Sequence, residues 1–379
     1  MMKKGYTTGS CSAAATMAAI EASLNRKFND YVTLKTPNGE ILNLEVLEKK
    51  LTNCGASCAI MKNSGDDPDV TNESLVFSEV KLIDEDEFKN LKALKENIEL
   101  ENRIILKGGQ GVGKITKPGL ACDIGEPAIN PVPRKMIGKC ALEAMQAYEY
   151  EGFVEITIAI PAGISLAEKT FNPKLGIIGG ISVLGTTGIV EPMSEQALVD
   201  TIKVEMNVCK ASKSDLVVIT PGNYGKDFLK NSSKLSEDII VKCSNFIGDA
   251  LIFAQDLNFK KVILSGHLGK LIKVAGGVMN THSKYGDRRM EIIMEHALRC
   301  GADSYVLEKI SQCVMVDEAV RILDVSGIKD VTMEAILESI VYEMKKKITN
   351  ADVGVIIFTN KYGLLACSDN IDRLLDEEI

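Results

Sequence analysis

After Glu191-Pro192 the chain alternates between short apolar segments and helical stretches, and this alternation constrains the fold more than any other feature. The apolar segments span 216–220, 239–242, 262–265 and 353–358. Short strands that are apolar throughout are typical of parallel sheets, in which helices cover both faces. Residues 193–379 are therefore predicted to form an α/β domain with a mostly parallel sheet.

The first half of the chain has a different pattern, in which strands outnumber helices. A Pro37-Asn38-Gly39 turn predicts a hairpin, and apolar residues at helical spacing predict a helix over 133–148. The charged stretch 84–96 is predicted to be a solvated loop or helix. Strands are predicted at 31–36, 41–48, 56–62, 75–83, 98–107 and 153–160. Residues 1–192 are therefore predicted to form a separate α+β domain, and the length of 379 residues also favours two domains.

Residues 5–19 join a glycine-bearing loop to an alanine-rich helix. Gly5 and Gly9 allow backbone angles that other residues avoid, and Thr8 or Ser10 can cap the helix. The first turn of such a helix presents free N–H groups and the positive end of the helix dipole. The segment alone is more typical of a capped helix packed on a sheet, and a ligand-facing loop is the alternative.

Composition argues against several classes of function. The net charge is −8, tryptophan is absent and aromatic residues make up 5%, so a nucleic-acid partner is not expected. No apolar run approaches the roughly 18–20 residues of a membrane span, and a polar loop follows Met1-Met2-Lys3-Lys4, so we expect a cytoplasmic protein without a membrane partner. The ten cysteines are scattered through apolar segments and suit reduced thiols. No metal-ligand spacing is present, so no protein-bound metal is expected.

Three predicted strands of the second domain end in loops rich in glycine and hydrogen-bonding side chains. In an open parallel sheet, ligands bind at the carboxyl ends of the strands. A glycine after one strand is usually only a tight turn, but three such loops in succession indicate a ligand site. The candidate ligand-binding residues are Gly222, Asn223, Tyr224, Asn245, Gly248, Asp249, Gly266 and Gly269.

The run at 108–114 approaches a phosphate-binding loop in its spacing. Ile115, however, occupies the position of the hydroxyl residue that would meet magnesium, and Pro118-Gly119 blocks the helix that must follow. The run is therefore predicted to be a mobile basic loop that can bind carboxylates, not a nucleotide site.

Together these segments resemble one family, the cobalt-precorrin-5B C(1)-methyltransferases of anaerobic cobalamin biosynthesis. No single motif is specific, but the combination is, and it spans roughly residues 5 to 290. The matching motifs include GYTTGSC at 5–11, KNSGDDPDVT at 62–71, EPAINPVPR at 126–134, PGNYG at 221–225, SNFIG at 244–248 and GHLGK at 266–270; the segments 108–119 and 171–194 also match.

The resemblance implies transfer of a methyl group from S-adenosylmethionine to C1 of a contracted tetrapyrrole, giving cobalt-precorrin-6A. It implies a ribosomal-protein-like βαβ arrangement in the first domain. Our own hypothesis is that S-adenosylmethionine binds on the three loops of the second. Cobalt would be present only within the substrate. The expected partners are the small-molecule tetrapyrrole and, transiently, neighbouring enzymes of the pathway.

The implied chemistry fits the residue types present. A sulfonium is a strong electrophile, so the enzyme mainly aligns it with the electron-rich ring, and no strong base is required. The carboxylates of the substrate need cations, for which the candidates are Lys114, Arg134, Lys174 and Lys270. Thr7, Thr8 and Ser10 become candidate contacts to a carboxylate at the helix start, which reverses the first interpretation of that segment. Proton handling is assigned to His267 and Asp66.

Two alternatives are carried with this interpretation. A small-molecule kinase would need nucleotide and magnesium, and Ile115 argues against it. A tetrapyrrole carrier would bind the macrocycle without affinity for S-adenosylmethionine and without turnover.

Overall fold

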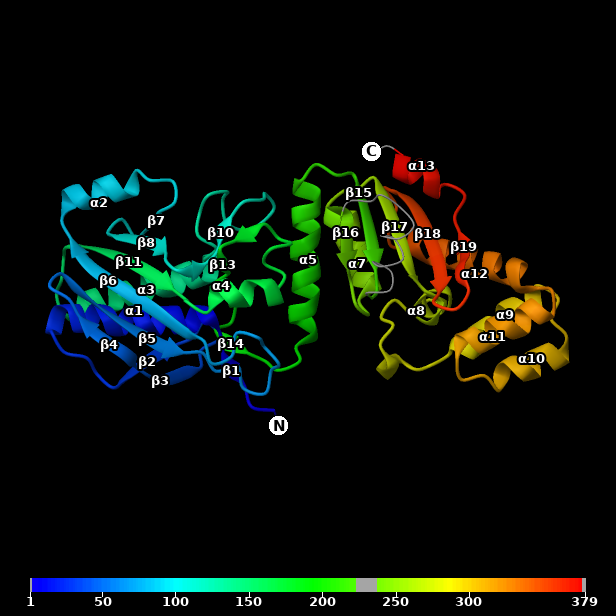
Figure 1. Cartoon of the computed structure of the whole chain (residues 1–379), viewed down its shortest axis with the longest axis horizontal. Coiled ribbons are helices and arrows are strands. Elements are labelled where there is room, and N and C mark those ends of the chain that lie inside the picture. Colours follow the sequence, from blue (N-terminus) through cyan, green and yellow to red (C-terminus); the bar gives the residue numbers. More distant parts are fainter. Residues whose placement is uncertain (1, 223–236, 377–379) are drawn as a thin grey trace. The chain divides into compact units, whose positions relative to one another are not determined.

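The computed structural model describes residues 2–222 and 237–376. They divide into two compact units, Met1–Ser194 and Glu195–Ile379, each with its own buried core (Figure 1).

The first unit is built on a six-stranded mixed sheet. Its strand order is β4 (Leu47–Leu51), β5 (Gly55–Met61), β6 (Leu75–Ile83), β11 (Phe153–Ala159), β8 (Ile104–Gly108) and β7 (Ile98–Leu100). Neighbouring strands are antiparallel except for β11 and β8, which are parallel and have α3 (Pro131–Ala147) between them in sequence. The strand predicted over 98–107 is two strands, because Glu101 and Asn102 adopt left-handed backbone angles (φ 52° and 57°) and turn the chain back.

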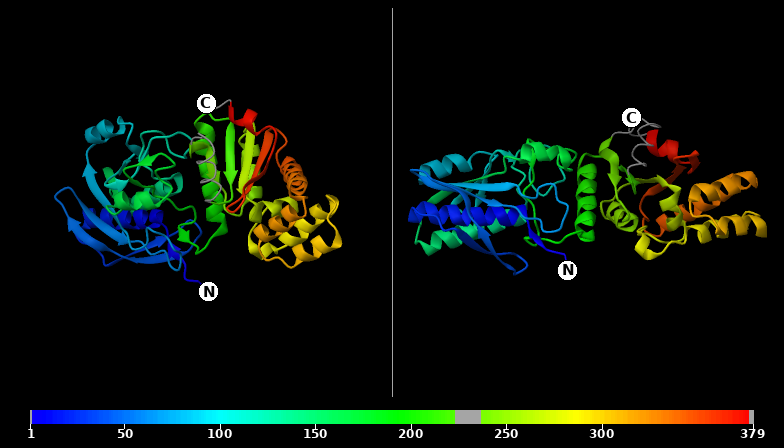
Figure 2. Two further views of the ribbon diagram at one scale, coloured as in Figure 1. Left: turned by 45° about the vertical axis from the view of Figure 1, so that its right-hand side comes forward. Right: turned by 60° about the horizontal axis from the view of Figure 1, so that its bottom comes forward.

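Helices cover both faces of this sheet. On one face α1 (Thr8–Asn25) packs against β5, β6 and α3, and Figure 2 shows α1, in blue, lying along the sheet in both views. The short α2 (Glu85–Lys92), in the charged stretch, places Phe88 against Ile83 and Ile105 in a separate cluster. Alternate residues of β8 point to opposite faces, so α2 lies on the face opposite α1.

The alanines of α1 allow a close approach to the sheet. Ala13, Ala14, Ala15 and Ala19 have no exposed surface. The Cys58 thiol lies 3.3 Å from the Ala15 carbonyl oxygen, and the Thr16 and Ser78 hydroxyls are 2.9 Å apart. Larger side chains would hold helix and sheet apart.

Short strands form the rest of the first unit. The run at 108–119 contributes two of them rather than an open loop, because Gly111 lies so close to Gly163 and Gly180 that a Cβ on any of the three would overlap neighbouring backbone. No helix follows Lys114, as a phosphate loop would require. The remaining elements are β1 (Gly5–Tyr6) with β14 (Ile189–Val190), β2 (Tyr31–Lys35) with β3 (Ile41–Glu45), β9 (Gly111–Val112) with β13 (Gly180–Ile181), β10 (Lys114–Ile115) with β12 (Ile177–Ile178), α4 (Gly163–Leu166) and η1 (Ala167–Lys169).

The second unit contains the predicted mostly parallel sheet. Its strand order is β16 (Ile240–Lys242), β15 (Leu216–Thr220), β17 (Lys261–His267), β18 (Asp352–Thr359) and β19 (Gly363–Cys367). The first four strands are parallel, and β19 is an antiparallel edge strand that the sequence did not predict.

Helices pack on this sheet in pairs. The helices α5 and α7 pack together against β15 and β16, whereas α8 and α12 pack together against β17 and β18. The remaining helices extend this core. The bounds are α5 (Glu195–Ala211), η2 (Glu237–Ile239), α7 (Ile247–Asp256), α8 (Leu268–Ala275), η3 (Ser283–Tyr285), α9 (Arg289–Arg299), α10 (Ser304–Ser311), α11 (Val316–Val325), α12 (Lys329–Lys345) and α13 (Ile371–Asp376).

Candidate functional site

The candidate site lies at the carboxyl edge of the parallel sheet in the second unit. The chain passes from β15 to its neighbour β16, then returns past β15 to β17 on the other side. The direction of the connections thus reverses at the ends of β15 and β17, and open α/β sheets bind ligands at such a point. Pro221 follows β15, Cys243 follows β16, and Leu268, the first residue of α8, directly follows β17. Asn223 and Tyr224 lie outside the described residues.

Lys270 connects the loops of this edge. Its Nζ donates to the Pro221 carbonyl oxygen at 2.9 Å and to Asn245 Oδ1 at 3.0 Å. Burial lowers the pKa of Lys270, and no carboxylate pairs with it in the described parts of the chain. Its partners among the described residues are therefore neutral oxygens, an arrangement that an anionic ligand would complete.

Asn245 and Asp249 add complementary polar groups. Asn245 Oδ1 accepts from Lys270 and, at 3.2 Å, from the Thr281 hydroxyl, so its amide N–H groups are the side-chain donors left for a ligand. Asp249 lies in the first turn of α7 and forms no hydrogen bond or ion pair with any residue that the structure describes. The edge thus offers hydrogen-bond donors to a ligand carboxylate. It also offers the Asp249 carboxylate to a ligand ammonium or hydroxyl group.

The predicted glycines differ in what surrounds them. A Cβ on Gly248 would lie 2.8 Å from Met279 Cβ, one on Gly266 3.0 Å from Leu271, and one on Gly269 3.2 Å from His267 Nδ1. A Cβ on Gly222 would meet no atom of the described residues within 4 Å. Close packing therefore accounts for Gly248, Gly266 and Gly269, but not, among the described residues, for Gly222.

His267 caps the helix that follows it. Its Nδ1 accepts the Gly269 backbone N–H at 3.0 Å. Burial lowers the pKa of His267, although the Asp317 carboxylate raises it by a smaller amount. The neutral ring consequently carries its proton on Nε2, where it can donate a hydrogen bond but not accept a proton.

Sequence reasoning overlooked Thr281, which holds Asn245 through its hydroxyl and accepts the buried Lys273 Nζ at its carbonyl oxygen (3.3 Å). Lys273 also donates to the Gly286 carbonyl oxygen at 3.0 Å. The sequence carries no periodic or spacing signal for these contacts, because they join separate loops.

In the first unit, Thr7, Thr8 and Ser10 are buried at the start of α1. The helix cap is Thr7 rather than Thr8 or Ser10, since Thr7 Oγ1 accepts the Ser10 backbone N–H at 3.2 Å. The Ser10 hydroxyl donates to the Gly188 carbonyl oxygen at 2.7 Å, and the Gly9 N–H donates to Leu184. Carbonyl oxygens of the segment 184–188 therefore accept hydrogen bonds from groups at the helix start that the sequence assigned to a ligand.

The aspartates of the 62–72 loop anchor the chain. Asp66 Oδ2 accepts the Lys3 backbone N–H at 2.6 Å, and Asp67 Oδ1 accepts the Met193 N–H at 2.9 Å. Asp69 forms an ion pair with the buried Lys62. Asp66 is exposed and lies on this anchoring loop.

The other predicted cations have varied surroundings. Arg134 is mostly buried and donates to the Ile129 carbonyl oxygen and to Glu126 Oε2, both at 2.6 Å. Lys114 is exposed, with its Nζ 3.3 Å from Glu96 Oε2. Lys174 is partly buried. Arg134 thus braces the 126–134 loop from within.

Two further observations concern the whole described chain. Residues 2–222 and 237–376 contain no group of three or more His, Cys, Asp or Glu side chains that could hold a metal ion. Within the same ranges, no helix is both long and apolar enough to cross a bilayer.

The fold and the site define a two-unit α/β protein with a polar edge on its parallel sheet. The sequence profile described as CbiD matches residues 1–192, and the profile of the CbiD C-terminal domain matches residues 280–369. The chain belongs to the CbiD family.

Relatives match over nearly the full chain. A protein of Ruminiclostridium cellulolyticum, named cobalt-precorrin-5B C(1)-methyltransferase, is 43% identical over 95% of this chain and 89% of its own length. A Clostridioides difficile protein of the same name is 36% identical over 99% of this chain and 96% of its own length. A crystal structure of the cobalamin biosynthesis protein CbiD from Archaeoglobus fulgidus is 25% identical, with a TM-score of 0.40, over 75% of this chain and 83% of that one.

Proposed function

We propose that this chain methylates C1 of cobalt-precorrin-5B, giving cobalt-precorrin-6A in anaerobic cobalamin biosynthesis. The observation that carries the proposal is 43% identity, over 95% of the chain, to a relative that bears the name of this activity. S-adenosylmethionine is the proposed methyl donor.

The reaction places a simple demand on the protein. A ring carbon supplies an electron pair to the methyl carbon, the carbon–sulfur bond breaks, and its electron pair stays on sulfur as S-adenosylhomocysteine. The protein must hold sulfur, methyl and ring carbon in line, which is mainly a matter of positioning.

S-adenosylmethionine is proposed to bind at the carboxyl edge of β15, β16 and β17. Lys270 and Asn245 would receive its carboxylate, and Asp249 its ammonium or ribose hydroxyls. The donors of Lys270 and Asn245 support this placement, as does the Asp249 carboxylate, which has no partner among the residues that the structure describes. Lys270, which the sequence assigned to the substrate, is thereby proposed for the cosubstrate.

The remaining predicted residues are proposed to serve the tetrapyrrole. Lys114 and Lys174 would meet substrate carboxylates, while Arg134 and the helix start at Thr7, Thr8 and Ser10 shape the loops that present them. Proton handling by His267 or Asp66 stays a prediction, and the contacts of both residues support structural roles.

One experiment separates the activity from its alternatives. The protein is incubated anaerobically with cobalt-precorrin-5B and methyl-labelled S-adenosylmethionine, and label is sought on the macrocycle. We expect one label per macrocycle, at C1. A carrier would bind the macrocycle without acquiring label, and a kinase would require nucleotide and magnesium.

The cellular setting is also a proposal. All ten cysteines lie in the described residues as free thiols, which suits the reducing cytoplasm. Transfer of the product to neighbouring enzymes by transient contact would suit a reactive intermediate.

A further inference from the structure

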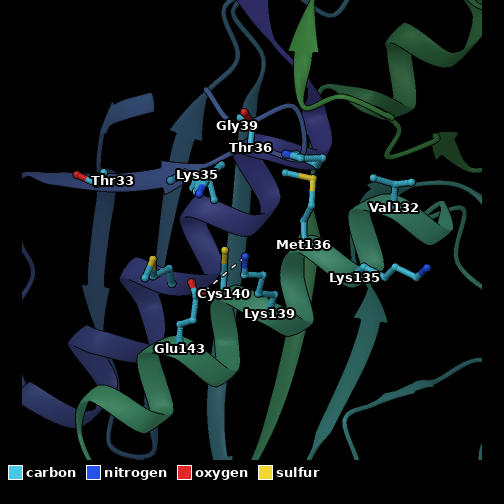
Figure 3. A pocket seen from close by; sticks show the side chains of 13 residues that line it. Thr33, Lys35, Thr36, Gly39, Val132, Lys135, Met136, Lys139, Cys140 and Glu143 are labelled. Atoms are coloured by element: carbon cyan, nitrogen blue, oxygen red, sulfur yellow. Dashed lines mark ion pairs between the residues drawn. The ribbon is translucent and has the colours of Figure 1, made fainter. Parts of the chain in front are cut away.

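A pocket of about 360 Å³ opens in the first unit between β2 with its following turn and α3 (Figure 3). Met17 of α1 and Leu34 of β2 contribute apolar lining, as do Val132, Met136 and Cys140 of α3. This combination of volume and apolar lining falls within the range of small-molecule sites, about 300–1,000 Å³.

The polar lining of this pocket is basic. It contains Lys35 from β2 and Lys135 and Lys139 from α3, with Glu143 as its one carboxylate. Lys135 and Lys139 are four residues apart and so share a helix face. Glu143 Oε1 lies 3.8 Å from Lys139 Nζ, whereas Lys35 and Lys135 form no ion pair within the described ranges. The pocket therefore carries a net positive charge on a chain whose net charge is −8.

The positive charge of the pocket favours one of the two ligands of the proposed reaction, the tetrapyrrole, over S-adenosylmethionine. S-adenosylmethionine carries a positive sulfonium, which the positive charges of Lys35 and Lys135 disfavour. A tetrapyrrole with acidic side chains offers a flat apolar ring and carboxylates at its edge, which complement the apolar floor and the basic rim.

We propose that this pocket binds a carboxylate-bearing edge of the tetrapyrrole substrate, an inference that rests on the proposed methyltransferase function. Its volume suits one ring and the acid groups of that ring rather than a whole macrocycle. The pocket is thus a subsite that fixes which edge of the macrocycle is held, and so contributes to the choice of the carbon that is methylated.

Uroporphyrin, a stable tetrapyrrole with carboxylates around its edge, is the probe for this subsite. Its fluorescence anisotropy is followed as the full chain is titrated in, for the wild type and for a Lys135→Glu/Lys139→Glu variant. Lys27→Glu/Lys50→Glu is the matched control, because it reverses two charges at exposed lysines of the same unit outside the pocket. Lys35→Gln/Lys135→Gln is a milder variant in case the first does not fold.

We expect both pocket variants to raise the Kd for uroporphyrin at least tenfold and to weaken its dependence on salt, whereas the control changes it less than threefold. An unchanged Kd in the pocket variants overturns the inference, as does an equal loss in the control. Methyl transfer by the wild type is assayed separately. If the wild type transfers the methyl group but the pocket variants bind uroporphyrin with an unaltered Kd, the subsite alone is refuted. If the pocket variants raise this Kd but the wild type transfers no methyl group, the proposed function alone is refuted.

Discussion

Two lysines of this chain, Lys62 and Lys270, are at least partly buried, but they differ in the charge of their hydrogen-bond partners. Lys62 is buried against the Asp69 carboxylate and the Thr71 hydroxyl. Lys270 is partly buried against the Pro221 carbonyl and the Asn245 side chain, neither of which carries a charge. A buried cation without an anion is costly, and such groups are concentrated at ligand sites. Lys62 therefore serves as a structural anchor, whereas Lys270 is the candidate for a binding group.

The first prediction concerns Lys270. Lys270→Met should raise the Kd for S-adenosylmethionine about tenfold or more, since a charge-assisted hydrogen bond of about 1.5–3 kcal/mol is lost. Because the folded pKa of Lys270 lies below 10.5, wild-type affinity should fall as the pH rises through that pKa. Lys270→Arg, whose charge persists, should lack this alkaline loss. Calorimetric titration between pH 7 and pH 10 measures both effects, and a Lys270→Met variant that binds normally would refute the assignment.

The second prediction concerns the pH dependence of stability. Burial raises the pKa of Asp69, but the charge of Lys62 and the hydrogen bonds from Lys62 and Thr71 outweigh it, so the net pKa lies below 3.8. The stabilisation is therefore complete above 3.8 and is lost as the pH falls through the folded pKa. Asp69→Asn should lower the free energy of unfolding by about 3 kcal/mol at pH 7, with a smaller difference at lower pH. Urea unfolding from pH 7 to pH 3 measures this, and a gap that stays constant with pH would contradict it.

At the scale of elements, the strands of the second unit were the most predictable part of the fold. The predicted strand 216–220 agrees with β15, and 353–358 agrees with β18 to within one residue at each end, because buried strands are apolar throughout. The edge strand β19 escaped prediction because its residues are mostly half-exposed and its pattern is mixed. The likeness of the first unit to ribosomal proteins stays a prediction.

The candidate site was less predictable than the elements that carry it. The sequence placed Asn245 and Lys270 among binding residues, but it could not show that they contact each other across 25 positions. The glycines did not distinguish a ligand site from close packing, since Gly248 and Gly266 follow strand ends but are also required by the side chains packed against them. A local pattern gives no information on which group a side chain meets in the fold, and this is why the sequence assigned Arg134 to a substrate carboxylate rather than to Glu126.

The third prediction concerns the cap of α8. His267→Ala should destabilise the second unit by about 1 kcal/mol, whereas His267→Asn, whose side chain also caps helices, should restore most of this stability. If His267 acts only as a cap, the asparagine variant should retain the single-turnover methylation rate of the wild type. A rate that falls equally in both variants while stability is restored would instead establish proton handling by the imidazole.

For the whole molecule, the important feature is that the two units have separate cores. The core of the first contains Ile156 from its mixed sheet, and the core of the second contains Ile263 from its parallel sheet. Each unit is large enough to unfold cooperatively, so the chain as a whole need not behave as a two-state system.

The fourth prediction is that calorimetry resolves two unfolding transitions. Ile156→Ala should lower the midpoint of one and Ile263→Ala that of the other, which assigns them. S-adenosylmethionine should then raise the transition of the second unit, and uroporphyrin that of the first, since a ligand stabilises the unit that binds it. A shift of both transitions by either ligand alone would contradict the assignment of one ligand to each unit.

The pairing of β1 with β14 has a consequence for how this chain can be rearranged. Gly5 lies opposite Val190 and Tyr6 opposite Ile189, so the two ends of the first unit meet as neighbouring strands. A module whose ends adjoin can be transplanted into a surface loop of another protein, or circularly permuted, without stretching its backbone. The first unit can therefore be moved between proteins as a single module, by evolution or by an engineer, with its core residues unchanged.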